Sequence, residues 1–203
     1  MDAQPSPPTT ASQLLPVLSL EDVCLFPGAS LDIVVHRPAQ LAALDIATRG
    51  GGGVLALLRY EPGSGPRDLH AVGTLARLRS RQATAPLEQH VELDGLERAH
   101  VLNLVGADLL VAEAEPLPEG DEGEEWGAAV EALARYLHAH PQLRGFLESQ
   151  RRSAEPMGWV NLACQHLPIT ASARQRLLEA TAAERCTKIS RGLDALLRKE
   201  QQA

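Results

Sequence analysis

Apolar and polar positions along the chain change their spacing near residue 120. Between residues 14 and 118 the apolar residues come in short runs, rich in leucine and β-branched side chains, which is typical of β-strands. In the runs 31–35 and 72–78 apolar and polar residues alternate, as expected where one face of a strand is buried. The first part of the chain is therefore predicted to be rich in β-strands.

Turn residues mark the breaks within this part. Asp94-Gly95 predicts a turn between the strands on either side of it. Pro116 and Pro118 are expected to end a last strand that begins at Leu109. The stretch 61–68 contains two prolines and two glycines, which predicts an exposed loop.

One helix is predicted to interrupt the strands. Pro38 suits a first helical position, Leu41 and Leu44 share one helix face, and Gly50 can end the helix. An apolar strand is expected directly after it, over residues 54–58.

The spacing becomes helical after an acidic connector, residues 119–125. Trp126, Val130, Leu133 and Leu137 form one apolar stripe. Pro141 and Pro156 are predicted to begin two further helices, and Thr170 to cap a fourth. A last helix carries the apolar stripe of Ile189, Leu193, Leu196 and Leu197.

These patterns predict an α+β chain in four segments. They are a disordered tail (1–13), a β-rich subdomain (14–118), an acidic linker (119–125) and a helical subdomain (126–203). The linker is polar enough to act as a hinge. Alternatively, Trp126 and Trp159 dock the helices onto the strands and make the two subdomains rigid.

Charge divides unevenly between the two subdomains. The 203 residues carry a net charge of −7, and residues 1–120 hold 15 acidic and 8 basic side chains against 11 of each over 121–203. An acidic β-rich half argues against nucleic acid as a partner, because phosphate binding requires a basic surface. It favours basic or neutral apolar segments as partners of that half.

The N-terminal residues and the cysteines indicate the cellular compartment. The first residues lack the basic start and apolar centre of a signal peptide, and no apolar run approaches the roughly 20 residues that a membrane span requires. The 3 cysteines are odd in number and far apart, unlike a disulfide framework. We therefore expect a cytoplasmic protein with reduced thiols and no membrane partner.

No pattern predicts a catalytic, cofactor-binding or metal-binding residue. Lys188 and Lys199 are the only lysines and neither follows the glycine pattern of a phosphate-binding loop, which excludes a P-loop ATPase. His138 and His140 have the wrong spacing for a metal pair on one helix face. Cys24 lies in an apolar run, where a thiol usually behaves as a small buried side chain.

Five segments, taken in order, resemble the N-terminal substrate-binding (LON) domain of Lon proteases. Gly95 and Arg98 stand where that family has a Gly-x-x-Arg hairpin, and Glu184-Arg185 resembles its Glu-Arg pair. The five segments are LPVLSLEDVCLFPG (15–28), AVGTLARL (71–78), VELDGLERAHVLNL (91–104), LVAEAEPL (110–117) and NLACQHLPITASARQRLLEATAAERCTKI (161–189).

The resemblance implies a PUA-like β-barrel subdomain followed by an α-helical bundle subdomain. It also implies a non-enzymatic module that binds unfolded or specific polypeptide segments, as an adaptor or regulator, with a protease or chaperone as a further partner. The chain ends at Ala203 without an ATPase or a Ser-Lys protease domain. We therefore expect a stand-alone LON-domain protein without peptidase activity.

Five residues are the candidates for polypeptide binding under this resemblance: Phe26, Pro27, Arg98, Leu109 and Leu110. Each also has a structural alternative. Phe26 and Pro27 can shape a tight turn at a barrel edge, and Arg98 can pair internally with Asp22 rather than with a partner carboxylate. One of the two leucines is expected to be exposed.

Two other functions remain open from the residues alone. A hydrolase would need a cleft that joins Cys24 or a histidine to carboxylates. A nucleic-acid binder would use the PUA-like barrel, which is an argument from fold analogy that the acidic charge opposes.

Overall fold

The computed structural model describes residues 12–61, 65, 67–120, 123–150 and 156–202. The tail predicted over 1–13 lies outside the described residues up to residue 11, and Gln13 already belongs to the first strand. The strands are β1 (Gln13–Leu20), β2 (Ser30–Val35), β3 (Gly53–Leu58), β4 (Val72–Ala85), β5 (Glu88–Val105) and β6 (Val111–Pro116). The helices are α1 (Pro38–Arg49), α2 (Glu125–Ala139), α3 (Pro141–Gln150), α4 (Pro156–His166), α5 (Ala171–Glu179) and α6 (Ala182–Glu200).

These strands form one mixed sheet in the order β2-β5-β4-β3-β1-β6. Strand β5 also pairs with β6, so the sheet closes on itself while β2 stays outside the ring. Strands β1 and β3 pair in parallel, and α1 lies between them in the chain as the crossover helix. The predicted α+β fold is confirmed, with a closed sheet that is less regular than a simple barrel.

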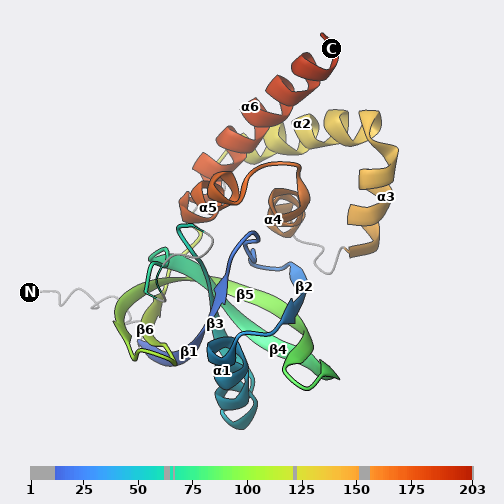
Figure 1. Cartoon of the computed structure of the whole chain (residues 1–203). Helices are drawn as coiled ribbons and strands as arrows, with labels where there is room; N and C mark the ends of the chain where they lie inside the picture. Colours follow the sequence, from blue (N-terminus) through green and yellow to red (C-terminus); the bar gives the residue numbers. More distant parts are fainter. Residues whose placement is uncertain (1–11, 62–64, 66, 121–122, 151–155, 203) are drawn as a thin grey trace, which may run out of the picture.

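Residues 16–20 of β1 and 54–58 of β3 are buried on both faces of the sheet. On one face Leu18 and Val54 pack in a core that α1 completes with Leu44. On the other face Val17 and Leu55 pack against β6. Helices α2 to α6 gather at the end of the sheet that faces away from α1 (Figure 1).

The predicted turn at Asp94-Gly95 is wrong, because β5 runs unbroken through both residues. Gly95 instead allows a close approach of two chain segments. Its amide donates to the carbonyl of Ala29 at 2.8 Å, and a Cβ atom there would lie 2.3 Å from the carbonyl oxygen of Phe26. The register shifts opposite this glycine, which leaves Leu96 exposed.

Helices α2 to α6 enclose a core that they share with the sheet. Cys24, Phe26, Ala29 and Leu58 from the β-rich half are buried in the same cluster as the helical leucines. Trp126 and Trp159 pack partly buried against that cluster. The division at residues 118 and 126 stays a prediction about domains, and residues 121–122 of the linker lie outside the described residues.

Candidate functional site

The Phe26-Pro27 segment lies in the junction between the sheet and the helices. The Phe26 amide donates to Gln165 Oε1 at 3.0 Å, and Gln165 Nε2 donates to the Ser30 carbonyl at 2.6 Å. Asn161 Nδ2 donates to the Pro27 carbonyl at 3.1 Å. Two polar side chains of α4 therefore satisfy the backbone of this segment, while both predicted binding side chains are buried.

Arg98 is buried in the same junction, with 1% of its surface exposed. Its Nη1 donates to the carbonyls of Leu178 at 3.0 Å and Ala180 at 2.7 Å, and its Nη2 donates to Pro118 at 2.6 Å. Its ion-pair partner is Glu119, at 3.3 Å, and not the predicted Asp22. Burial lowers the pKa of Arg98, and the Glu119 carboxylate acts in the opposite direction.

A second buried arginine, Arg185, enters the junction from α6. It donates from Nε to the Leu177 carbonyl at 2.8 Å and from Nη1 to Asn161 Oδ1 at 2.6 Å. Its Nη2 lies 3.0 Å from Glu119 Oε2, and its guanidinium carbon lies 5.8 Å from the centre of the Phe26 ring. The two family-like motifs at Arg98 and Arg185 therefore meet at one carboxylate.

The two predicted leucines separate at the start of β6. Leu110 is buried in the sheet core, and Leu109 is half-buried. Four of the five predicted binding residues thus pack inside the protein, because the junction and the sheet core need their apolar and hydrogen-bonding groups. Direct contact of these residues with a polypeptide stays a prediction.

The Cys24 thiol is buried against α5. Burial raises the pKa of its thiol to about 12, so the group is protonated at neutral pH. Its sulfur lies 3.8 Å from the Ala171 carbonyl and from Gln175 Oε1. Within the described residues no group of three or more histidines, cysteines and carboxylates could hold a metal ion.

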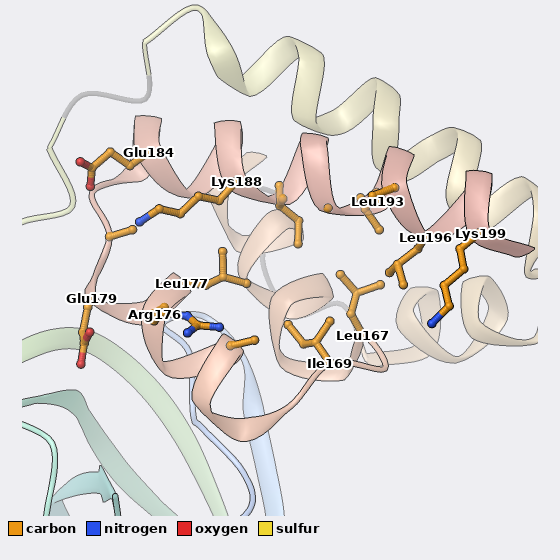
Figure 2. A pocket seen from close by; sticks show the side chains of 15 residues that line it. Leu167, Ile169, Arg176, Leu177, Glu179, Glu184, Lys188, Leu193, Leu196 and Lys199 are labelled. Carbon is orange, nitrogen blue, oxygen red and sulfur yellow. The ribbon is translucent and has the colours of Figure 1, made fainter.

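An open apolar groove lies between α5 and α6 and has a volume of about 640 Å³. Figure 2 shows its leucines between the two helices. We call it the α5–α6 groove. Its larger apolar lining residues are Leu167, Ile169, Leu177, Ile189, Leu193 and Leu196.

Charged side chains border the groove. Arg176 comes from α5, Lys188 and Lys199 come from α6, and all three are exposed. Glu179 and Glu184 lie beside the end of the groove nearest the sheet (Figure 2). The arrangement can bind apolar side chains and, at its rim, charged groups.

Gly192 leaves free space along the α6 side of the groove. It is exposed on α6, and a Cβ atom there would meet nothing within 4 Å. The groove is bordered there by the small residue Ala195 of the same helix. A partner's backbone can therefore approach α6 closely at this point.

Comparison with known proteins agrees with the fold. The family profile described as the ATP-dependent protease La (LON) substrate-binding domain matches residues 14–194. The chain belongs to the LON substrate-binding domain family.

The relatives that this chain matches include much longer Lon proteases. The Lon protease of Phenylobacterium zucineum is 31% identical over a match that covers 90% of this chain and 24% of that protein. Lon protease 1 of Thermus thermophilus is 28% identical, over 91% of this chain and 24% of that protein. The chain therefore spans about a quarter of the length of these relatives.

Two solved LON domains share the fold. The N-terminal domain of the Mycobacterium avium complex Lon protease superposes with a TM-score of 0.69 at 22% identity, covering 89% of this chain and 96% of that one. The Lon N-terminal domain protein of Xanthomonas campestris gives a TM-score of 0.62 at 20% identity, covering 87% of this chain and 96% of that one.

Sequence reasoning missed the α5–α6 groove. The sequence predicts an apolar stripe of Ile189, Leu193, Leu196 and Leu197 on the last helix, and only Ile189 and Leu193 of these are buried. The signal that could have found the groove is the pair Lys188 and Lys199, which share the edge of that stripe on one helix face.

Proposed function

We propose that this LON domain is a non-enzymatic module that binds polypeptide segments through apolar side chains seated in the α5–α6 groove. The observation that carries the proposal is an open apolar groove on a chain of a substrate-binding domain family. A groove between two helices suits a peptide that inserts several apolar side chains. Unfolded or unusually exposed segments of other proteins supply such side chains.

The module is proposed to act as an adaptor or regulator in the cytoplasm, presenting bound polypeptides to a protease or chaperone. Its three cysteines are free and buried, which suits a reducing compartment. None of the helices in the described part of the chain has the length and apolar character that a bilayer crossing needs.

The test fills the groove without disturbing the core. Gly192→Phe adds an aromatic ring at a position where a Cβ atom meets no neighbour. We expect the whole wild-type chain to bind a fluorescently labelled, reduced and alkylated unfolded protein, and the variant to bind it about tenfold more weakly. Fluorescence anisotropy without nucleotide measures both affinities.

Gly145→Phe is the matched control. Gly145 is an exposed helical glycine of α3 that also meets nothing within 4 Å and does not line the groove. This variant should bind as the wild type does. Equal binding by wild type and Gly192→Phe would contradict the groove as the site, and no binding by any of the three would contradict the proposed function.

A further inference from the structure

The charged side chains at the groove differ in whether other groups of the protein contact them. Glu184 accepts from the Thr181 amide at 3.1 Å as part of the helix cap. Glu179 accepts from Gln175 Nε2 at 2.9 Å and lies 3.1 Å from His70 Nδ1. Both acidic groups are therefore held by contacts within the chain.

Within the described residues no hydrogen bond or ion pair holds the cations at the rim, and the charge of Lys188 acts on Glu184 from a greater distance. Among the residues that the structure describes, Arg176, Lys188 and Lys199 form no ion pair. Lys188 and Lys199 are eleven positions apart on α6, which places them on one face and, at 1.5 Å per residue, about 16 Å apart along the axis. The apolar side chains of Leu193 and Leu196 lie between them (Figure 2).

We infer that the α5–α6 groove selects polypeptide segments in which a short apolar run is bracketed by carboxylates, the apolar side chains lying on Leu193 and Leu196 and the carboxylates on Lys188 and Lys199. This inference rests on the proposed polypeptide binding. Charge complementarity sets the sign, because the three cations outnumber the two carboxylates at the groove, and only the carboxylates are held by hydrogen bonds within the chain. An extended peptide covers this distance in about five residue steps, so about four apolar residues lie between the two carboxylate residues.

A preference for carboxylates at this groove is opposite to the expectation drawn from net charge. The acidic β-rich half favours basic or neutral segments, but the groove lies on the helical half, where residues 121–203 hold equal numbers of acidic and basic side chains. Local rim charges govern contacts at this surface, since exposed charges farther away than about 10 Å are screened at 0.1 M salt.

The test compares three labelled peptides with the same apolar run of about four residues. They carry glutamate, glutamine or lysine at both ends of the run. We expect the glutamate peptide to bind the whole chain about tenfold more tightly than the lysine peptide, with the glutamine peptide between them. The difference should disappear at about 1 M salt, where the screening length falls to about 3 Å.

Reversing the charge of the two lysines of α6 tests whether they cause the preference for the glutamate peptide. Lys188→Glu with Lys199→Glu should remove the advantage of the glutamate peptide and favour the lysine peptide. The control, Arg191→Glu with Arg198→Glu, makes the same change in net charge on exposed residues of the same helix that do not line the groove. It should keep the preference for glutamate.

Each contrary result identifies what fails. Equal binding of the three peptides, all weakened by Gly192→Phe, would overturn the inference and leave the proposed function standing. Binding of none of them, nor of the unfolded protein, would overturn both. Self-association of the chain that Gly192→Phe abolishes in analytical ultracentrifugation would identify a second copy as the occupant and overturn the inference.

Discussion

Glu119 joins residues that are far apart in the sequence. Its two carboxylate oxygens lie 3.3 Å from Arg98 Nε and 3.0 Å from Arg185 Nη2. The carbonyl of Ala180 accepts from both arginines as well. Removing a buried arginine with several partners is costly mainly because those partners are left unsatisfied. The junction is therefore more sensitive to loss of Arg98 than any exposed ion pair would be.

Arg98→Met should lower the free energy of unfolding by about 3–5 kcal/mol. The substitution leaves the carbonyls of Leu178 and Pro118 without their donor and removes one partner of Glu119. Urea denaturation measures the loss. Arg79→Met, at an exposed position of β4, should change stability by about 0.5 kcal/mol or less. A similar loss in both variants would contradict the structural role given to Arg98.

At the scale of elements, the N-terminus of α6 is fixed by a capping box. Thr181 Oγ1 accepts from the Glu184 amide at 3.3 Å, and the Glu184 carboxylate accepts from the Thr181 amide. These hydrogen bonds, together with the more distant charge of Lys188, hold the pKa of Glu184 below its ordinary value of 4.5. The cap positions the helix that forms one wall of the groove.

Glu184→Gln keeps a side chain that can cap but removes the charge. A carboxyl whose pKa is lowered by folding adds stability above its ordinary pKa, and that stability is lost as the pH falls through the lowered value. We therefore expect the wild type to be more stable than the variant at neutral pH and the difference to vanish in acid. Urea midpoints from pH 7 downward test this, and a difference independent of pH would contradict it.

Local patterns predict the elements well where one local signal acts alone. Pro38, Pro141 and Pro156 begin α1, α3 and α4 as expected, and Thr170 caps α5. The prediction is wrong at Asp94-Gly95. Glycine is required there because the carbonyl of Phe26, which is distant in sequence, packs where a Cβ atom would lie, and not because the chain turns. Partners remote in sequence leave no local pattern.

The candidate site was hard to predict for the same reason. The side chain of Arg98 could be recognised as important, but its partners Leu178, Ala180 and Glu119 come from other segments. The apolar stripe on α6 gave no indication of which positions α2 covers and which remain open. Only the packing of the helices separates a buried leucine such as Leu193 from the half-buried Leu196.

At the scale of the whole molecule, the two halves share one core. The Phe26 side chain is fully buried among helical residues although it belongs to the β-rich half. The backbone on either side of it is held by Gln165 and Asn161 of α4. Such a junction couples the unfolding of the sheet to that of the helices.

Phe26→Ala should lower the stability of both halves together by about 3–5 kcal/mol. Tryptophan fluorescence follows the helical half, since Trp126 and Trp159 both lie there, and hydrogen exchange of the buried β3 amides follows the sheet. The two probes should report the same loss in the free energy of unfolding. Loss of the helical signal while the sheet stays protected would contradict a shared core.

Phe146→Ala is the control, because the chain contains only these two phenylalanines and Phe146 is 44% exposed on α3. Its ring makes one edge contact with His166, with 4.9 Å between the centroids. Its removal should lower stability by about 1 kcal/mol.

The position of the two lysines has a practical consequence. Lys188 and Lys199 are the only lysines in the sequence, and both border the α5–α6 groove. Amine acylation of this chain is therefore confined to the groove rim and the α-amino group. A single reagent that acylates amines would label the groove without any engineered residue, and a bound segment would shield those two nitrogens from it.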